Sequence, residues 1–291
     1  MTSELEAPAS HAATGAPAAV WVDLRPQLGM GGNLHRQHLQ HRATSACAAH
    51  TAQLLREALH HPSAAAGGRV VLATTPAVVA AAAGLTPAER QRLVVVGPDL
   101  RGLIREATEL GLMAAGARRM LRLGAWQVLR LGLTCMPEAP GVLRRQFPAM
   151  LRVLARVELA QALRLRAGAF VLQAQLTDLA VGMGNPALLH DVVRLVRRAG
   201  LQPGLATANP AALDVAALTA HDAAAGPGAP PLLVLLSRGS RPASAGTLAK
   251  AIIVGAPDTQ PDVELRGLRA APGLAPAWEP PDACDGPGAD A

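Results

Sequence analysis

The sequence predicts an α/β protein built around a mostly parallel β-sheet, with a (β/α)8-like barrel, divergent or incomplete, as the preferred architecture. Two observations support this fold class. Short apolar runs alternate along the chain with longer segments of helical periodicity, and most of the runs are apolar throughout instead of alternating with polar residues. Such runs are typical of strands covered on both faces, as in parallel sheets. A doubly wound open sheet is the alternative, because it needs no closure.

Seven runs predict strands, and in chain order they span residues 20–24, 69–74, 93–97, 169–173, 204–207, 232–236 and 251–255. The run at 204–207 carries the weakest signal. A closed barrel needs an eighth strand, which we expect within 220–231, within 134–141 or among residues 1–40. Strand, crossover helix and strand in series imply parallel neighbours with right-handed connections.

The predicted helices share a start signal, in which a capping side chain is followed directly by proline. It occurs at Thr75-Pro76, Asn185-Pro186 and Asn209-Pro210. An oxygen-bearing cap satisfies the first backbone N–H groups, and proline is well tolerated at the first helical position. The clearest helix covers 186–199, where apolar residues follow the helical period and Gly200 ends it.

The interval between residues 97 and 169 is too long for one crossover helix. After a helix near 99–110, two or three more helices rich in Leu and Arg are predicted, and three prolines break or begin them. We therefore predict an Arg-rich helical insertion after the third strand, over about 112–168. This segment holds ten arginines against two glutamates, a net charge of +8, whereas the whole chain carries +6.

A single α/β domain is expected over residues 19–269. Residues 1–18 and 270–291 are rich in Ala, Pro, Gly and Asp without periodicity, which predicts disordered tails. The N-terminus lacks the pattern of a signal peptide, and no apolar stretch is long enough to span a membrane. The three cysteines show no paired spacing, so we expect no disulfide framework and a cytoplasmic location.

The candidate site residues follow from the rule that ligands bind beyond the carboxyl ends of parallel strands. Three aspartates fall there, and we predict that they are catalytic carboxylates for proton transfer: Asp23, Asp99 and Asp178. Polar side chains at the same strand ends are predicted to contact the substrate: Thr74, Gln173, Gln175, Asn209 and Arg238. The arginine of this set is predicted to bind an anion. Asp99 and Asn209 are also placed to cap helices. No residue is assigned to a metal, and the sequence identifies no cofactor.

Other kinds of chemistry find little support. The glycine-rich loop at 27–33 matches neither the dinucleotide-binding nor the Walker pattern. There is no G-x-S-x-G elbow, and the one lysine, Lys250, precedes its strand, at the wrong end of a barrel for Schiff-base chemistry. Three histidines at helical spacing have no carboxylate or cysteine beside them, which favours an exposed helix face over a metal site: His35, His38 and His41.

The segment AKAIIVGAPDTQPDVELRGL, residues 249–268, resembles the last βα unit of aldo/keto-reductase-type (β/α)8 barrels. In that family a strand ending in V-G precedes a short loop and a helix, so the resemblance implies a barrel. The reaction of the family uses a tyrosine with a lysine, a histidine and an aspartate, whereas this chain contains no tyrosine. The resemblance therefore concerns the fold and not the catalytic residues.

Two classes of function fit these features. The first is a small-molecule enzyme of lyase, isomerase or hydrolase type that acts on an anionic substrate at the strand ends. The alternative is a non-catalytic binding protein that docks an anionic partner or a membrane surface through the Arg-rich helices in 112–168. A degenerate barrel kept as a structural subunit is a third reading. Sequence-specific nucleic-acid recognition is disfavoured, because Trp126 and Phe147 are the only aromatic residues in that segment.

Overall fold

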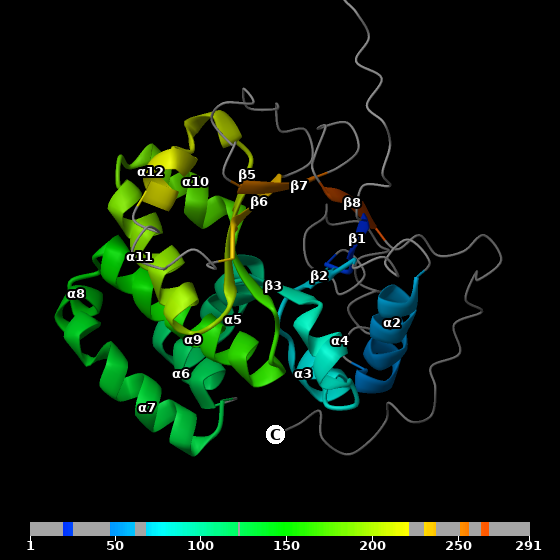
Figure 1. The fold of residues 1–291 in the computed structure, drawn as a ribbon. Coiled ribbons are helices and arrows are strands. Elements are labelled where there is room, and N and C mark those ends of the chain that lie inside the picture. The colour runs from blue at the N-terminus through cyan, green and yellow to red at the C-terminus, as the bar shows by residue number, and fades with distance from the viewer. Residues whose placement is uncertain are drawn as a thin grey trace, which may run out of the picture.

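The computed structural model shows a mixed α/β fold in which strands form one curled parallel sheet and helices pack around it (Figure 1). The described residues are 20–25, 47–61, 68–121, 123–220, 230–236, 251–255 and 263–267. The predicted tails, the glycine-rich loop at 27–33, the three histidines in 35–41 and Arg238 lie outside them. The α/β class with a parallel sheet, predicted from the apolar runs, is confirmed.

The strands follow one another in the sheet in chain order, and every neighbouring pair is parallel. They are β1 (Val20–Asp23), β2 (Val70–Leu72), β3 (Leu93–Gly97), β4 (Ala169–Leu172), β5 (Gln202–Thr207), β6 (Leu232–Leu236), β7 (Ala251–Gly255) and β8 (Val263–Gly267). The last strand also pairs with the first, with Trp21 opposite Leu265 and Val22 opposite Arg266. All seven predicted strands are present, within two residues of their expected bounds.

The eighth strand lies outside the three places where we expected it. It is β8, and it stands where the family resemblance implies a helix after the strand at 251–255. Its sequence, VELRG, alternates apolar and charged residues, so it lacks the continuous apolar pattern that identifies the other strands. Residues 134–141, one of the expected places, are helical.

Helices connect the strands and surround the sheet (Figure 1). They are α2 (Ala48–His60), α3 (Pro76–Ala82), α4 (Pro87–Gln91), α5 (Leu100–Leu110), α6 (Leu112–Leu121), α7 (Ala125–Cys135), α8 (Ala139–Leu143), α9 (Phe147–Leu165), α10 (Ala174–Gly182), α11 (Pro186–Arg198) and α12 (Val215–Ala220), with 3-10 turns η2 (Met136–Glu138) and η3 (Pro210–Ala212). Each of the strands β1 to β5 is followed by at least one helix before the next strand. The connections after β6 and β7 fall outside the described residues.

Two of the three predicted proline caps form as expected. The Thr75 hydroxyl accepts a hydrogen bond from the backbone N–H of Val78 at 3.2 Å, and the Asn185 side chain accepts one from that of Leu188 at 3.3 Å. At the third, the side chain of Asn209 makes no capping hydrogen bond. The segment after it is a single 3-10 turn that closes on the Asn209 backbone carbonyl instead, so no free N–H is presented to the side chain.

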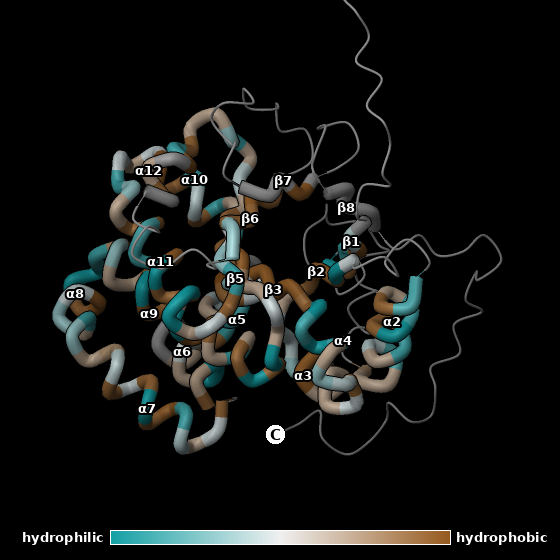
Figure 2. Tube along the Cα trace, in the orientation of Figure 1, coloured by the Kyte–Doolittle hydropathy of each residue, from teal (hydrophilic) through white to brown (hydrophobic). Residues whose placement is uncertain are grey.

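Alternate side chains of strands β1 to β6 enter two separate apolar cores. In β2, Val70 and Leu72 belong to the core shared with the helices, whereas Val71 belongs to a second core built almost wholly from strand residues. This second core fills the inside of the curled sheet and consists of Trp21, Val71, Val94, Val96, Ala169, Val171, Ala206, Leu233, Leu235 and Val254. Both faces of β2 to β6 are therefore buried, which explains the continuous apolar sequences of β2, β3, β4 and β6; Figure 2 shows β3 and β6 in hydrophobic colours.

Five α-helices, α5 to α9, occupy the interval between β3 and β4, where we predicted one helix near 99–110 and two or three more. The longest is α9, with 19 residues, and it packs against β3, β4 and α11. Helices α7 and α8 lie at the periphery of the molecule (Figure 1). The interval thus contains one helix, α9, with buried residues in the main core; Leu100 of α5 packs against this core, and α7 packs in a separate small one.

Two findings concern the cysteines and the membrane spans considered in the sequence analysis. Of the cysteines, Cys135 is free. In the part of the chain that the structure describes, no helix is both long enough and apolar enough to cross a membrane.

Candidate functional site

The carboxyl ends of the strands share one edge of the sheet, because all strand pairs are parallel. At this edge Asp23 ends β1, Thr74 follows β2 by two residues, Asp99 follows β3 by two, and Gln173 directly follows β4. The predicted anion holder, Arg238, comes two residues after β6 and lies outside the described residues. Three of these residues, Thr74, Asp99 and Gln173, belong to one connected polar cluster.

The centre of this cluster is Glu158, which projects from α9 and is only 2% exposed. The hydroxyl of Thr74 donates a hydrogen bond to Glu158 Oε2 at 2.9 Å. The guanidinium of Arg119, from α6, donates to Glu158 Oε1 at 3.0 Å. Both carboxylate oxygens are therefore satisfied within the protein, one by a neutral donor at the strand edge and one by a charged donor.

Arg119 joins three helices at this point. Its Nε donates to the Glu106 carboxylate of α5 at 2.9 Å, and a terminal nitrogen lies 3.3 Å from the backbone carbonyl oxygen of Asp99, to which it donates. The Arg119 side chain is 8% exposed, so its charge is balanced by the two carboxylates and not by solvent. A buried arginine with this many acceptors fixes the relative positions of α5, α6 and α9.

The Asp99 side chain does not cap α5, although the residue occupies the N-cap position. It lies against Gly102 instead, and a Cβ on Gly102 would overlap the Asp99 carboxylate and lie 3.2 Å from the Arg119 guanidinium. Glycine at position 102 therefore makes room for a carboxylate at the strand edge. As a residue, Asp99 is partly exposed.

Gln173 connects the end of β4 to the start of α5, next to the same polar cluster. Its side-chain oxygen accepts a hydrogen bond from the backbone N–H of Leu100 at 3.2 Å, and its own N–H donates to the Gly97 carbonyl at 2.9 Å. The start of α5 is thus held against β4 as well as against β3. Thr74, Asp99 and Gln173, which lie in three different connections, are brought together.

The electrostatics of the cluster are dominated by the burial of Glu158. Burial raises the pKa of this carboxyl above its usual value, because the charged form loses its hydration. The Arg119 charge and the Thr74 hydrogen bond oppose this rise in pKa, whereas the nearby negative charge of Asp99 adds to it. One carboxyl is therefore biased toward its protonated form next to a second carboxyl at the sheet edge.

Asp178 belongs to a second, smaller cluster at the ends of β4 and β5. Its carboxylate accepts a hydrogen bond from the buried Thr207 hydroxyl and another from the backbone N–H of Ala208 at 3.0 Å. The Thr207 oxygen in turn accepts from the N–H of Asn209 at 2.9 Å. These contacts shape the turn after β5, so Asp178 has a local structural role whatever else it does.

The remaining predicted residues are placed separately. Asp23 forms a two-point ion pair with Arg25, at 2.9 Å to Nε and 2.8 Å to Nη2. Gln175 is exposed on α10. Within the described residues no hydrogen bond or ion pair joins Asp23, Asp99 and Asp178 to one another. The three aspartates share an edge of the sheet, and only Asp99 belongs to the Glu158 cluster.

The sequence reasoning missed the two most buried charges of the site, Arg119 and Glu158. A signal was present: Glu158 stands among the apolar residues of α9 that face the core, between Ala155 and Leu159. A lone glutamate on the apolar face of a helix requires a buried partner. The partner itself could not be identified, because it lies 39 residues away in another helix.

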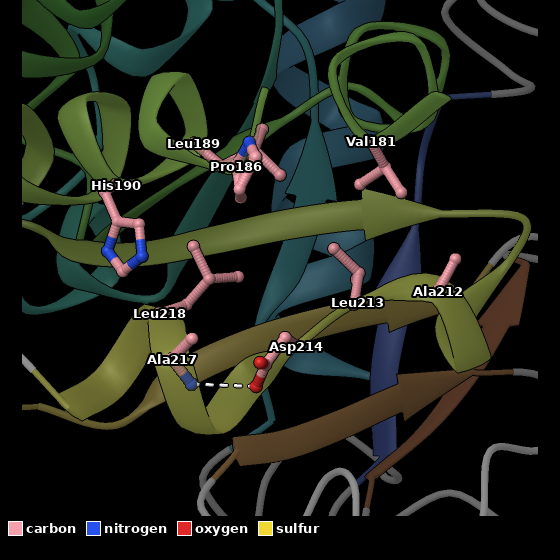
Figure 3. Close-up of a pocket in the computed structure, with 9 residues that line it drawn as sticks. All are labelled: Val181, Pro186, Leu189, His190, Ala212, Leu213, Asp214, Ala217 and Leu218. Atoms are coloured by element: carbon pink, nitrogen blue, oxygen red, sulfur yellow. Dashed lines mark hydrogen bonds between the residues drawn. The ribbon is translucent and has the colours of Figure 1, made fainter. Parts of the chain in front are cut away.

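A small pocket opens elsewhere, among α10, α11, η3 and α12 (Figure 3). Its volume is about 210 Å³, and most of its lining is apolar, with His190 and Asp214 as the titratable members. Asp214 already accepts a hydrogen bond from the backbone N–H of Ala217 at 2.8 Å, which caps α12. Ligand sites usually enclose about 300 Å³ or more, so we do not place a substrate here.

No group of three or more His, Cys, Asp or Glu side chains in the described residues is arranged to hold a metal ion. Fold and site together define an α/β protein with a parallel sheet and a polar cluster at its strand ends. Comparison of the chain with family models, with curated proteins and with solved structures gives no match.

Proposed function

We propose that this chain is a (β/α)8-barrel enzyme of lyase, isomerase or hydrolase type, acting on a small anionic substrate at the carboxyl ends of β2 to β4. The barrel assignment is supported by the pairing of β8 with β1 and by the helix that follows each of β1 to β5. The observation that carries the function is the link from Asp99, through Arg119, to the buried Glu158. Two carboxyls in different environments are a common arrangement for proton transfer.

In this proposal Asp99 is the group that exchanges a proton with the substrate. It is partly exposed at the strand edge, and the glycine at position 102 leaves space for its carboxylate. Arg119 and Glu158 are positioning residues, because Arg119 holds the Asp99 backbone and Glu158 holds Arg119. Thr74 links the buried Glu158 to the edge, since its hydroxyl donates to that carboxylate while its side chain is partly exposed.

The anionic substrate is inferred from Arg238, which comes two residues after β6 in the sequence, following the carboxyl end of that strand. Arg119 does not take this role, because its guanidinium is already committed to two carboxylates. Asp23 and Asp178 lie at the same edge but are engaged with Arg25 and Thr207. We therefore assign proton transfer to Asp99 alone among the three predicted aspartates.

A ligand screen followed by a variant series tests this function. Small carboxylates and phosphate esters are added to the full chain, and we expect at least one to raise its melting temperature, because a ligand that binds only the folded state stabilises it. Turnover of that ligand is then followed by NMR. Asp99→Asn should lower kcat by about 100-fold or more without lowering the melting temperature, since loss of a general acid–base group costs about that much.

The matched control is Glu57→Gln, which makes the same kind of charge removal on the exposed surface of α2. It should leave both kcat and the melting temperature unchanged. Arg238→Gln should raise KM for the anionic ligand. Full activity of Asp99→Asn on a turned-over ligand would contradict the assignment of Asp99, and the absence of any stabilising anion in the screen would contradict the anionic substrate.

A further inference from the structure

Helix α7 presents an unusual outward face. The side chains of Trp126, Leu129, Leu133 and Met136 are 74%, 55%, 61% and 64% exposed, respectively. They recur at spacings of three and four residues, so they form one stripe on one side of the helix and its 3-10 extension. Soluble proteins carry scattered exposed apolar residues, but a contiguous stripe of this kind marks an interaction surface.

The opposite side of α7 is already packed. Leu131 is buried in a small core with Leu123 and Val157, and Val128 and Cys135 pack against the same core. The orientation of α7 is therefore fixed by contacts with α6 and α9, and the apolar stripe faces outward because the other side is occupied. Figures 1 and 2 show α7 at the edge of the molecule, with hydrophobic segments along its length.

The sequence on either side of the stripe carries exposed charge of one sign. Among the described residues in 112–146, the exposed charged side chains are all arginines: Arg118, Arg130, Arg144 and Arg145. The sequence contains one acidic residue in this range, Glu138, and its carboxylate is 12% exposed and ion-paired with Arg152 at 2.8 Å and with Arg156 at 3.4 Å. Arg130 lies on α7 itself, one turn along the helix from Trp126.

We propose that the exposed stripe of α7, defined by Trp126, Leu129, Leu133 and Met136, docks on the surface of an anionic lipid bilayer. Tryptophan and leucine beside arginine are the composition of helices that lie in the membrane interface, where the apolar face enters the acyl boundary and the cations meet lipid phosphates. Anionic lipid is favoured over a second copy of the chain, because two copies would bring like-charged arginine clusters together.

Vesicle binding by the full chain tests the proposal. The chain is floated with phosphatidylcholine vesicles that contain about one third phosphatidylglycerol, and in parallel with pure phosphatidylcholine vesicles. We expect binding to the anionic vesicles, and at least about a tenfold loss when salt is raised from about 0.1 M to about 1 M, because the Debye length falls from ~10 Å to ~3 Å. Equal binding to neutral vesicles, or no binding to either, would overturn the proposal.

A matched pair of variants locates the contact. Leu129→Gln with Leu133→Gln should weaken vesicle binding by about tenfold or more, because two buried apolar side chains are lost from the contact. Leu179→Gln with Met183→Gln removes two exposed apolar side chains from the far helix α10 and its end, and should change binding by less than about twofold. If both pairs weaken binding equally, the stripe on α7 is not the docking surface.

Fluorescence provides a measurement that does not depend on those variants. Of the three tryptophans, Trp21 is 5% exposed and Trp126 is 74% exposed, whereas Trp278 lies outside the described residues. Vesicles should therefore shift the emission of the wild-type chain to the blue, and Trp126→Phe should remove that shift. Sedimentation equilibrium without lipid tests whether the stripe binds a second copy of the chain instead. If the wild type is a dimer, the variant Leu129→Gln with Leu133→Gln is a monomer, and no vesicle binding is seen, the stripe is a dimer interface and the proposal is overturned.

Discussion

Arg119 and Glu158 form a buried ion pair at 3.0 Å, in which one partner comes from α6 and the other from α9. Removing Arg119 would leave the buried Glu158 carboxylate without a cationic partner, whereas removing Glu158 would leave Arg119 paired with Glu106 alone. The structure at the ends of β2 and β3 is therefore sensitive to substitution of this pair. The pair adds less net stability than its short distance suggests.

Replacing Arg119 with methionine should destabilise the folded chain strongly. At pH 8 we expect a loss of about 3 kcal/mol in the free energy of unfolding, because Glu158 is left as an unpaired buried charge. At pH 5 the loss should be smaller, since Glu158 can then take up a proton. Urea denaturation at the two pH values measures both. The control is Arg118→Met, one residue earlier in α6 and exposed, which should change stability by less than about 0.5 kcal/mol.

Glu158 should also impose a pH dependence on stability in the unmodified chain. Its pKa is raised above the usual 4.5 by burial, so the folded state keeps a proton in a pH window where the unfolded chain has lost it. The stability from this group is therefore complete below the unfolded pKa and decreases as the pH rises through the folded pKa, by at most about 1.4 kcal/mol per pH unit.

The measurement is the difference in unfolding free energy between the wild type and Glu158→Gln across pH 4 to 9, a range of about five units that brackets the usual carboxyl pKa. Subtracting the two curves removes the contributions of the other carboxyls. The wild type should lose stability relative to the variant as the pH rises. A difference that stays flat would show that burial does not raise the pKa of Glu158.

Gly204 in β5 faces Val171 of β4 inside the curled sheet. A Cβ at position 204 would lie 2.6 Å from Val171 Cγ2 and 3.1 Å from the Cβ of Leu233. Gly204→Ala should therefore cost about 2 kcal/mol through overpacking. Adding Val171→Ala should recover part of this cost, so a double-mutant cycle should show a favourable coupling. Gly116→Ala in α6, where the added Cβ meets nothing within 4 Å, should instead be neutral or stabilising.

Glu138 should contribute stability that disappears in acid. The Arg152 hydrogen bond is the main reason why the pKa of this carboxyl lies below its usual 4.5, and Arg156 adds to the effect. Because the folded pKa is lowered, the contribution is present above the unfolded pKa and is lost as the pH falls through the folded pKa. Glu138→Gln should cost about 1 kcal/mol at pH 7 and nothing near pH 2. Equal costs at both pH values would contradict this prediction.

The site could be predicted from the sequence only in part. Thr74, Asp99 and Gln173 were found, because each follows an apolar run and the ends of parallel strands must share an edge. Arg119 and Glu158 were not found, because they lie within helices, where position along the chain says nothing about the strand edge. The contact between Thr74 and Glu158 spans 84 residues, which no local pattern encodes.

The sequence by itself determined the strands with continuous apolar runs, the proline-led helix starts at Thr75 and Asn185, and the placement of basic charge in 112–168. These are local properties, set by side-chain shape and by hydrogen bonding within a few residues. Tertiary structure alone decided the pairing of β8 with β1, the partner of Glu158, and which side of α7 faces outward. Each of these depends on which surfaces meet across long stretches of chain, and burial is a property of the packed molecule.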